Sequence, residues 1–555
     1  MGPSRALRGQ AALLPGAPHA MLARRQSRPP GVFVRIGMLV GLLAAALVLA
    51  SCAHRDRNAP LAAENFRRDY GYRKAALHGE RLPRHHIVMT ASGGGTRAAA
   101  LAQGVLRELA ATPIDAAGRT MADEIDLVSS VSGGSVTAAN FALYGKEGLE
   151  AYEANFLRRN LMADLIGGVI NPVNWLRFGL TSDSRIDLLV ELLDETVFHG
   201  ATYADLIRRG DGPLLILNAA DMSSGVRFTF TQSQFDLLCS DLTPLRIAEA
   251  VAASAAYPVG LTPITLTNYS PCPFQFSGGD YAGLISRVQS AVGDNIHKDP
   301  EDRPDSVPRS DSDTLYVSPQ GVEIEQRYVG LREQRWLNLD GEKNYVHLLD
   351  GGIADNLGLG EPLELISAAG QDGSIAARIN GGNGEPLEEI VFLVVNARSD
   401  PSTTRDRAPD TPGIVAMGLA SIGAAIDGRS SGLQAQLATL DQLVGGSSEG
   451  RLRARIVPVD FDLIRDERCR AAFANIGTNW NLDDPEIDGL MEMGAAMLRA
   501  SPAYQELVFM AGGTVAPDPD AAGEPWPGQA RARRACERLL YPKRDPGPLR
   551  FGNPA

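Results

Sequence analysis

One stretch of the chain, Leu127–Ser135, constrains the fold more than any other. It reads Leu-Val-Ser-Ser-Val-Ser-Gly-Gly-Ser, an apolar run that ends at Ser132 and is followed at once by Gly133 and Gly134. A chain that turns sharply from a strand into a helix needs small residues beside the turn, and a serine on such a turn stands clear of the backbone. The stretch therefore predicts a strand–turn–helix unit that presents the Ser132 hydroxyl as a nucleophile. A plain serine–glycine turn is the alternative for the pentapeptide alone.

The segments around this serine alternate between strand and helix patterns. The strand pattern Ile87–Ala91 is followed, after a glycine-rich stretch, by apolar residues at helical spacing over Arg97–Ala110. The strand pattern Ile125–Val131 then leads into Ser132, and a helical pattern leaves it over Ser135–Tyr144. This alternation predicts an α/β fold with a mostly parallel central sheet.

Further strand patterns follow along the chain. The turn signal Ser223–Gly225 separates two of them and predicts a hairpin. A fully apolar run indicates a strand buried on both faces, and the last pattern contains Pro458, which cannot donate a ladder hydrogen bond, so we expect an edge strand. A short helix is expected near Arg531–Leu540. In chain order the strand patterns are Pro213–Asn218, Val226–Phe230, Tyr345–Leu349, Ile390–Val395 and Ala454–Val459.

The composition is that of a globular protein and does not suggest binding to nucleic acid, with a local basic patch inside the acidic whole as the alternative. The 555 residues, 44% of them hydrophobic, exclude a wholly disordered chain and suffice for one large domain with insertions. The formal net charge is −13, and no basic stripe or arginine-rich arm offers a surface for nucleic acid. No Cys-x-x-Cys or histidine-rich spacing indicates a metal site.

The N-terminus has the pattern of an export signal. Arginines precede the apolar run Ile36–Ala50, which is short for a membrane span of about 20 residues but suits a signal peptide. The run ends in Leu-Ala-Ser-Cys52, which resembles a bacterial lipobox and implies cleavage before Cys52 and its lipidation. Ala53 does not resemble an inner-membrane retention signal, so we expect an outer-membrane lipoprotein that faces the periplasm. An uncleaved anchor and a plain signal peptide are the alternatives.

Cleavage at this site would change the net charge of the mature chain. Residues 1–51 hold six arginines and no acidic residue, so their removal changes the formal net charge from −13 to −19. Membrane contact would then come from the lipid on Cys52.

We expect a tether over 52–80, one domain over 81–513 and a tail over 514–555. Proline and charge over 286–330 predict a surface insertion, either an ordinary solvated loop or a lid.

Four cysteines remain after Cys52, an even number that permits disulfides in an exported chain. Three connectivities are possible. Sequence proximity favours Cys239–Cys272 and Cys469–Cys536, and four buried free thiols are the alternative.

A second glycine motif, Gly93–Arg97, lies between the first strand and its helix. Its sequence, Gly-Gly-Gly-Thr-Arg, lets a ligand approach the backbone closely, and the helix N-terminus adds positive potential. These properties suit an oxyanion or a phosphate, but the stretch lacks the phosphate-loop pattern and fits the dinucleotide pattern only loosely. Arg97 can either hold the loop or contact an anionic head group.

A third motif, Leu348–Asn356, places Asp350 at the end of a strand beside two glycines. We expect this carboxylate in the crevice at the carboxyl edge of an open α/β sheet, where it can act as the base for Ser132. An aspartate that caps a turn is the alternative. Because His347 and His199 carry no motif, we predict a serine–aspartate pair without a histidine.

These three motifs, in this order, resemble the signature of the patatin-like phospholipase family. The small-residue segment Ala252–Pro258 and the strand–turn–strand segment Asn218–Phe230 are also similar to the family, so the resemblance covers about residues 86–400. It implies a three-layer α/β/α fold and a lipid acyl hydrolase that needs no metal or cofactor. The sequence departs from the family pattern at Ser130, which replaces the usual first glycine of the serine motif.

The resemblance also implies a role for each motif residue. Ser132 would attack an ester carbonyl, and Asp350 would accept its proton. The backbone N–H groups of the glycine loop, with that of the residue after the nucleophile, would hold the oxyanion. The implied oxyanion donors are Gly93, Gly94, Gly95 and Gly133, and the supporting residues are Arg97, Gly134, Gly351 and Gly352.

The implied substrate is a phospholipid or lysophospholipid. The apolar stretch Ile414–Ile426 is either a buried helix or, if it lines the site or the surface, an acyl-chain pocket or membrane-facing patch. Two other functions remain open. One is an esterase or thioesterase that acts on smaller acyl substrates, and the other is a non-catalytic envelope lipoprotein.

Overall fold

The computed structural model describes residues 56–65, 70–73, 85–270 apart from 182 and 259, 342–363, 388–398, 422–437 apart from 425, 453–515 and 526–542. The predicted signal with Cys52, the insertion 286–330, Cys272 and most of the stretch 414–426 lie outside these residues. Within them, no helix has both the length and the apolar character that a membrane crossing requires.

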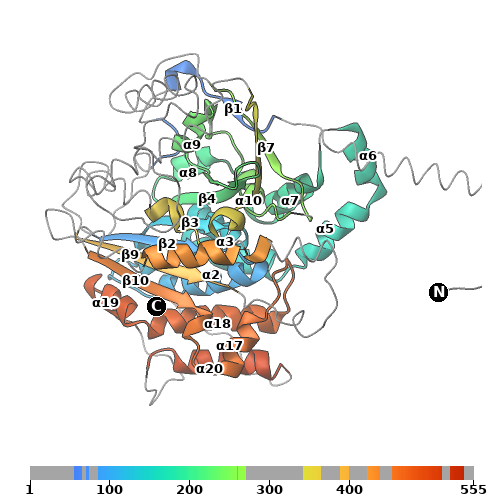
Figure 1. Cartoon of the computed structure of the whole chain (residues 1–555). Coiled ribbons are helices and arrows are strands. Elements are labelled where there is room, and N and C mark those ends of the chain that lie inside the picture. The colour runs from blue at the N-terminus through green and yellow to red at the C-terminus, as the bar shows by residue number, and fades with distance from the viewer. Residues whose placement is uncertain are drawn as a thin grey trace, which may run out of the picture.

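The fold is built on an eight-stranded mixed sheet with the order β10-β9-β2-β3-β4-β8-β7, to which β5 adds by pairing with β4 (Figure 1). The strands from β10 to β4 are parallel, whereas β8, β7 and β5 run antiparallel to their neighbours. The predicted mostly parallel α/β sheet is therefore confirmed. The strands are β2 His85–Ala91, β3 Ile125–Val131, β4 Leu214–Asp221, β5 Arg227–Thr229, β7 Ile264–Thr267, β8 Tyr345–Asp350, β9 Glu389–Asn396 and β10 Arg453–Asp460.

Local predictions about these strands hold. Every residue of β9 is buried, as its continuous apolar run predicts for a strand covered on both faces. At the sheet edge, β10 carries Pro458, where a missing N–H leaves no neighbouring strand unpaired. The β4–β5 hairpin forms through a turn in which the N–H of Gly225 donates to the carbonyl of Asp221 at 2.7 Å.

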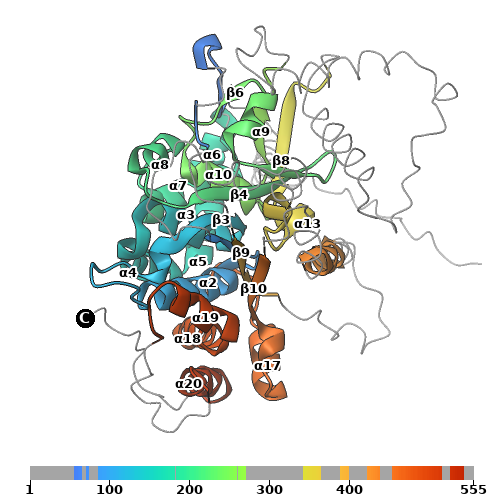
Figure 2. The ribbon, with the colours of Figure 1, turned by 90° about the vertical axis from the view of Figure 1, so that its left-hand side faces the viewer.

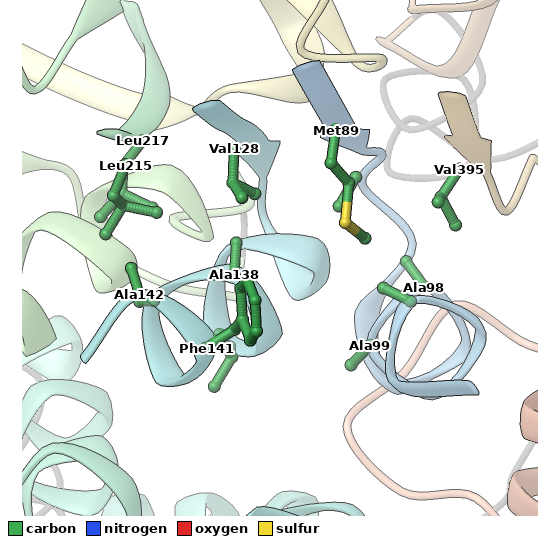
Figure 3. Packing of buried hydrophobic residues seen from close by; sticks show 14 of the residues in the cluster. Met89, Ala98, Ala99, Val128, Ala138, Phe141, Ala142, Leu215, Leu217 and Val395 are labelled. Atoms are coloured by element: carbon green, nitrogen blue, oxygen red, sulfur yellow. The ribbon is translucent and has the colours of Figure 1, made fainter. Parts of the chain in front are cut away.

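Helices cover both faces of the sheet. Figure 3 shows α2 (Gly95–Ala110) and α3 (Gly133–Tyr144) on one face, where small side chains let both helices approach the strands closely. The opposite face carries α13 (Gly352–Asp355) and the helical residues 426–437, at the right of Figure 2. The predicted three-layer α/β/α arrangement is therefore confirmed. Figure 3 labels Ala98, Ala99, Ala138, Phe141 and Ala142 from the helices against Met89, Val128, Leu215, Leu217 and Val395 from the strands.

A C-terminal helical unit packs outside α2. It contains α17 (Glu467–Ala474), α18 (Asp484–Ala500), α19 (Pro502–Met510) and α20 (Gln529–Leu540), and Figure 2 shows α2, α18 and α20 stacked in turn. The expected C-terminal helix and the expected disulfide Cys469–Cys536, between α17 and α20, are both confirmed. Cys239 is also disulfide-bonded, and its predicted partner Cys272 lies outside the described residues.

The described residues of the predicted tether 52–80 pack against the domain. Arg57 donates to Asp187 at 2.7 Å and to Glu249 at 3.3 Å, in α7 (Arg185–Leu193) and α10 (Ile247–Ser254). Tyr72 is fully buried and its hydroxyl oxygen accepts from the N–H of Leu215 at 2.7 Å. These polar groups find their partners far away in the sequence, so local composition does not show that the segment is packed. The remaining elements are β1 (Ala59–Pro60), β6 (Ser240–Asp241), α4 (Leu149–Tyr152), α5 (Leu161–Ile170), α6 (Pro172–Leu180), α8 (Tyr203–Arg209) and α9 (Gln232–Leu237).

Candidate active site

Ser132 lies at the junction between β3 and α3, as the sequence predicts. Its backbone has φ +49° and ψ −120°, a conformation that non-glycine residues rarely adopt and that surrounding structure must hold in place. A Cβ atom at Gly133 would lie 2.0 Å from the carbonyl oxygen of Gly95, and one at Gly134 would lie 2.6 Å from that of Ser92. The two glycines after the serine are therefore required because backbone segments pack directly against them.

The structure brings Ser132 and Asp350 together across 218 residues of sequence. The Oγ of Ser132 donates to Oδ2 of Asp350 at 2.8 Å, and the N–H of Gly352 donates to Oδ1 at 2.8 Å. Both side chains are buried, with only 8% and 6% of each residue exposed. One carboxylate oxygen thus meets the serine while the other is held by the turn.

Asp350 ends its strand, as the sequence predicts, but the sequence left the direction of this strand open. β8 runs antiparallel to β4 and pairs Asp350 with Ala219, near the carboxyl end of β4. The strand enters from the opposite direction and ends beside the Ser132 turn. The direction of β8 depends on how the chain returns to the sheet, and the local Asp-Gly-Gly sequence does not show this.

Burial governs the protonation of Asp350. Desolvation raises the pKa of Asp350 to about 6, although hydrogen bonds from the Gly352 N–H and the Ser132 hydroxyl act in the opposite sense. Among the described residues, no arginine or lysine forms an ion pair with this carboxylate. A buried carboxylate with a pKa near 6 is mostly ionised at neutral pH and remains a stronger base than an exposed aspartate.

Ser254 holds the nucleophile in place, and the sequence analysis did not single it out. Its Oγ accepts from the N–H of Ser132 at 2.9 Å, donates to the carbonyl of Asn218 at 2.6 Å and lies 2.9 Å from Oγ of Ser135. The Ser254 side chain is completely buried. Only the small-residue segment Ala252–Pro258 drew attention to this region, and that pattern does not show which residue forms the bond.

The same segment also positions Asp350. The N–H of Gly351 donates to the carbonyl of Ser254 at 3.0 Å, and the N–H of Asp350 donates to that of Ala256 at 3.0 Å. The C-terminal end of α10 therefore lies between the serine turn and the aspartate turn and fixes both.

The glycine-rich loop lies on the other side of Ser132. The N–H of Gly93 donates to the carbonyl of Asn356 at 3.0 Å, which corrects the expectation that this N–H is free to hold an oxyanion. Gly94 and Gly95 have φ +144° and +59°. Over the described part of the chain, no acceptor is bonded to the N–H of Gly94, Gly95 or Gly133.

Two residues that follow α17, Ile476 and Asn479, hold this loop. The guanidinium of Arg97, 2% exposed, donates to the carbonyl of Ile476, and the N–H of Thr96 donates to that of Asn479 at 2.9 Å. A Cβ atom at Gly95 would lie 2.4 Å from the same Asn479 oxygen. Of the two roles that the sequence allowed for Arg97, the structure shows the loop-holding one. Burial lowers the pKa of Arg97 to about 10, so it stays charged at neutral pH.

Neither His347 nor His199 is bonded to Ser132 or Asp350. Nδ1 of His347 is 2.9 Å from Oγ1 of Thr265, and His199 ends a helical segment in a left-handed conformation. In the portion of the chain covered by the structure, no cluster of histidine, cysteine, aspartate or glutamate is arranged to hold a metal ion.

The fold and these contacts define an α/β protein with a hydrolase-type serine turn bonded to a buried carboxylate. Residues 89–282 match the family model "Patatin-like phospholipase". No curated protein matches the chain.

Solved structures similar to this chain include human GIVD cytosolic phospholipase A2, with 14% sequence identity and a TM-score of 0.29 over 66% of this chain. This chain spans about half the length of that protein, 50%. A second similar structure is VipD from Legionella pneumophila, with 13% identity and a TM-score of 0.19, which covers 83% of this chain and 91% of VipD.

Proposed function

We propose that this protein is a serine-dependent lipid acyl hydrolase in which Ser132 is the nucleophile and Asp350 is the base. One observation carries the proposal: the 2.8 Å hydrogen bond from the Ser132 hydroxyl to the buried Asp350 carboxylate. A serine hydroxyl becomes an effective nucleophile only when an adjacent group accepts its proton. The family match supports an ester of a lipid as the substrate class.

The reaction follows from this geometry in two steps. Oγ of Ser132 attacks the ester carbonyl as Asp350 takes its proton, which is then delivered to the departing alcohol and leaves an acyl group on the serine. Water, deprotonated by Asp350, attacks this acyl-enzyme, and the proton returns to Ser132 as the fatty acid leaves. The oxyanion of each step would be held by N–H groups of Gly94, Gly95 and Gly133, where two helix N-termini add positive potential.

The proposed substrate is a phospholipid or lysophospholipid. An esterase or thioesterase for smaller acyl groups uses the same chemistry and differs only in what the entrance admits. A non-catalytic binding protein is the remaining alternative, and the bonded Ser132–Asp350 pair argues against it, because binding alone does not require a buried carboxylate against a strained serine.

We further propose that the protein is a lipoprotein of the bacterial outer membrane, facing the periplasm and anchored through Cys52. The disulfide Cys469–Cys536 supports export, because disulfides persist in oxidising compartments. Mass spectrometry of the mature N-terminus tests the anchor: a diacylglyceryl group on Cys52 is expected, and an unmodified N-terminus or an intact signal would contradict it.

Comparative acyl release tests the activity. We expect fatty acid release from phospholipid or lysophospholipid vesicles to exceed release from short-chain and thioester substrates, and Ser132→Ala to abolish both. Faster turnover of short esters with no release from vesicles would favour the esterase alternative. Absence of turnover on every substrate would favour the non-catalytic alternative.

A further inference from the structure

Two helices that play no part in the site, α5 and α6, follow each other around a bend at the right-hand margin of the molecule in Figure 1. These two helices and the bend between them are called the hairpin below. Asn171 ends α5 and caps α6, whose first residue is Pro172, so the turn between them is tight. Large apolar side chains are exposed along this hairpin: Ile166 (52%), Val169 (37%), Ile170 (65%), Val173 (69%) and Trp175 (38%).

The tip of the hairpin, residues 165–175, carries no charged side chain, although 21% of the whole chain is charged. Charged residues return only at its base, where they are paired. Arg159 binds Asp164 at 2.7 Å, and Arg177 binds Asp183 at 2.6 Å. An exposed apolar patch without charge is unusual on a soluble surface and marks an interaction site.

The polar groups of the tip are bonded within the hairpin itself. The indole N–H of Trp175 donates to the carbonyl of Val169 at 2.6 Å, and the Asn174 amide donates to that of Gly168 at 2.8 Å. The Asn171 side chain accepts from the N–H of Val173 at 3.0 Å. These groups keep their partners when water is removed, which lowers the cost of entering an apolar medium.

The hairpin also lies close to the point where the N-terminal segment reaches the domain. A Cβ atom at Gly168 of α5 would lie 3.2 Å from the Leu188 side chain of α7, and Asp187 of α7 binds Arg57. Cys52 precedes Arg57 by five residues, a contour of at most about 18 Å. A lipid on Cys52 would therefore enter the bilayer within reach of α7 and the hairpin.

We propose that the α5–α6 hairpin is a membrane contact whose tip, residues 165–175, inserts at the boundary between head groups and acyl chains of a phospholipid bilayer. This inference rests on the proposed lipid anchor and lipid substrate. A mature chain with a formal net charge of −19 would be repelled by anionic lipid, so the apolar hairpin would add to the adhesion that the lipid on Cys52 supplies. Anchor and hairpin together hold the domain against the surface that contains its substrate.

Insertion is tested on the mature lipidated protein reconstituted into phosphatidylcholine vesicles. An environment-sensitive fluorophore is attached at Ile170→Cys or, as a control, at Phe509→Cys, because Phe509 of α19 is an exposed apolar side chain (78%) outside the hairpin. We expect lipids brominated near the glycerol to quench the label at position 170 at least about threefold more than the label at 509. Equal quenching at the two positions would overturn the proposal.

A second experiment separates this inference from the proposed activity. The double variant Ile170→Asp, Val173→Asp should lower turnover of vesicle phospholipid by about tenfold and leave turnover of a water-soluble short ester unchanged, whereas Phe509→Asp should change neither. Conversion of an oligomer to a monomer by the double variant would identify a second copy as the occupant and contradict the proposal. If the parent turns over no ester, the proposed function fails, and the quenching result still decides the hairpin.

Discussion

The two sides of the active site are supported by different parts of the chain. The nucleophile and the base are fixed by the end of α10, where Ser254 and Ala256 bond to their backbones. The glycine-rich loop is fixed instead by Asn356 and by Ile476–Asn479, which follow the disulfide-linked helix α17. The family match ends at residue 282 and so covers the first support but not the second. A recognisable motif thus depends on positions that the motif does not include.

Asp350→Asn should have the largest effect of the variants that probe this comparison. Asparagine keeps the shape but cannot take the serine proton, so we expect acyl turnover to fall by about 10⁴-fold. The free energy of unfolding of the variant, by contrast, should not fall below that of the parent above pH 6. Burial raises the pKa of Asp350 from 3.8 to about 6, so ionisation costs the native state about 3 kcal/mol as pH rises from 4 to 6. Denaturation above pH 6 should therefore show that the variant is as stable as the parent or more stable. Substantial remaining acyl turnover in the variant would point to another base.

The pH profile of the parent follows from the same group. The carboxylate must be ionised to act as a base, so kcat/KM should fall about tenfold per unit below a midpoint near pH 6 and level off above it. The profile is measured with a water-soluble ester, so that membrane contact does not contribute. A midpoint near 4 would mean that Asp350 is not desolvated as described.

Arg97→Met tests the support of the glycine loop. Methionine fills similar space but removes the bond to Ile476, so we expect kcat to fall by about 10²-fold with little change in KM. Arg107→Met on the same helix is the matched control, because Arg107 pairs with Glu153 at the partly exposed end of α2. If the two variants are equally active, the loop does not depend on Arg97.

Ser254→Ala tests the other support and should have a smaller effect. The substitution leaves the N–H of Ser132 and the carbonyl of Asn218 without their partner, and we expect a fall in kcat of about tenfold with an unchanged pH midpoint. Ser135→Ala removes a neighbouring hydroxyl but keeps both bonds, so it should stay within about twofold of the parent. A larger loss in Ser135→Ala would contradict the assignment.

Local pattern predicted the parts of this molecule that depend on near neighbours in sequence. Hydrophobic spacing located α2, α3 and β9 within a few residues, and the glycines after Ser132 indicated its turn. The antiparallel direction of β8 was not predictable, because it depends on how the chain returns after a long connection.

The engaged N–H of Gly93 was missed for a related reason. Its acceptor, Asn356, lies far along the chain, and the acceptor for Arg97, Ile476, lies farther still. No spacing rule links such positions. The sequence also did not predict that the apolar side chains of α5 and α6 are exposed, because an apolar helix pattern is usually that of a buried helix.

Fluorophosphonate labelling followed by peptide mapping tests the central claim most directly. The reagent reacts with an activated serine, so the account predicts one adduct, on the peptide that contains Ser132, and none in Ser132→Ala. Labelling should be strongly slowed in Asp350→Asn, because the bonded carboxylate activates the hydroxyl. An adduct on a different serine, or equal labelling of parent and Ser132→Ala, would contradict the assignment of Ser132 as the nucleophile.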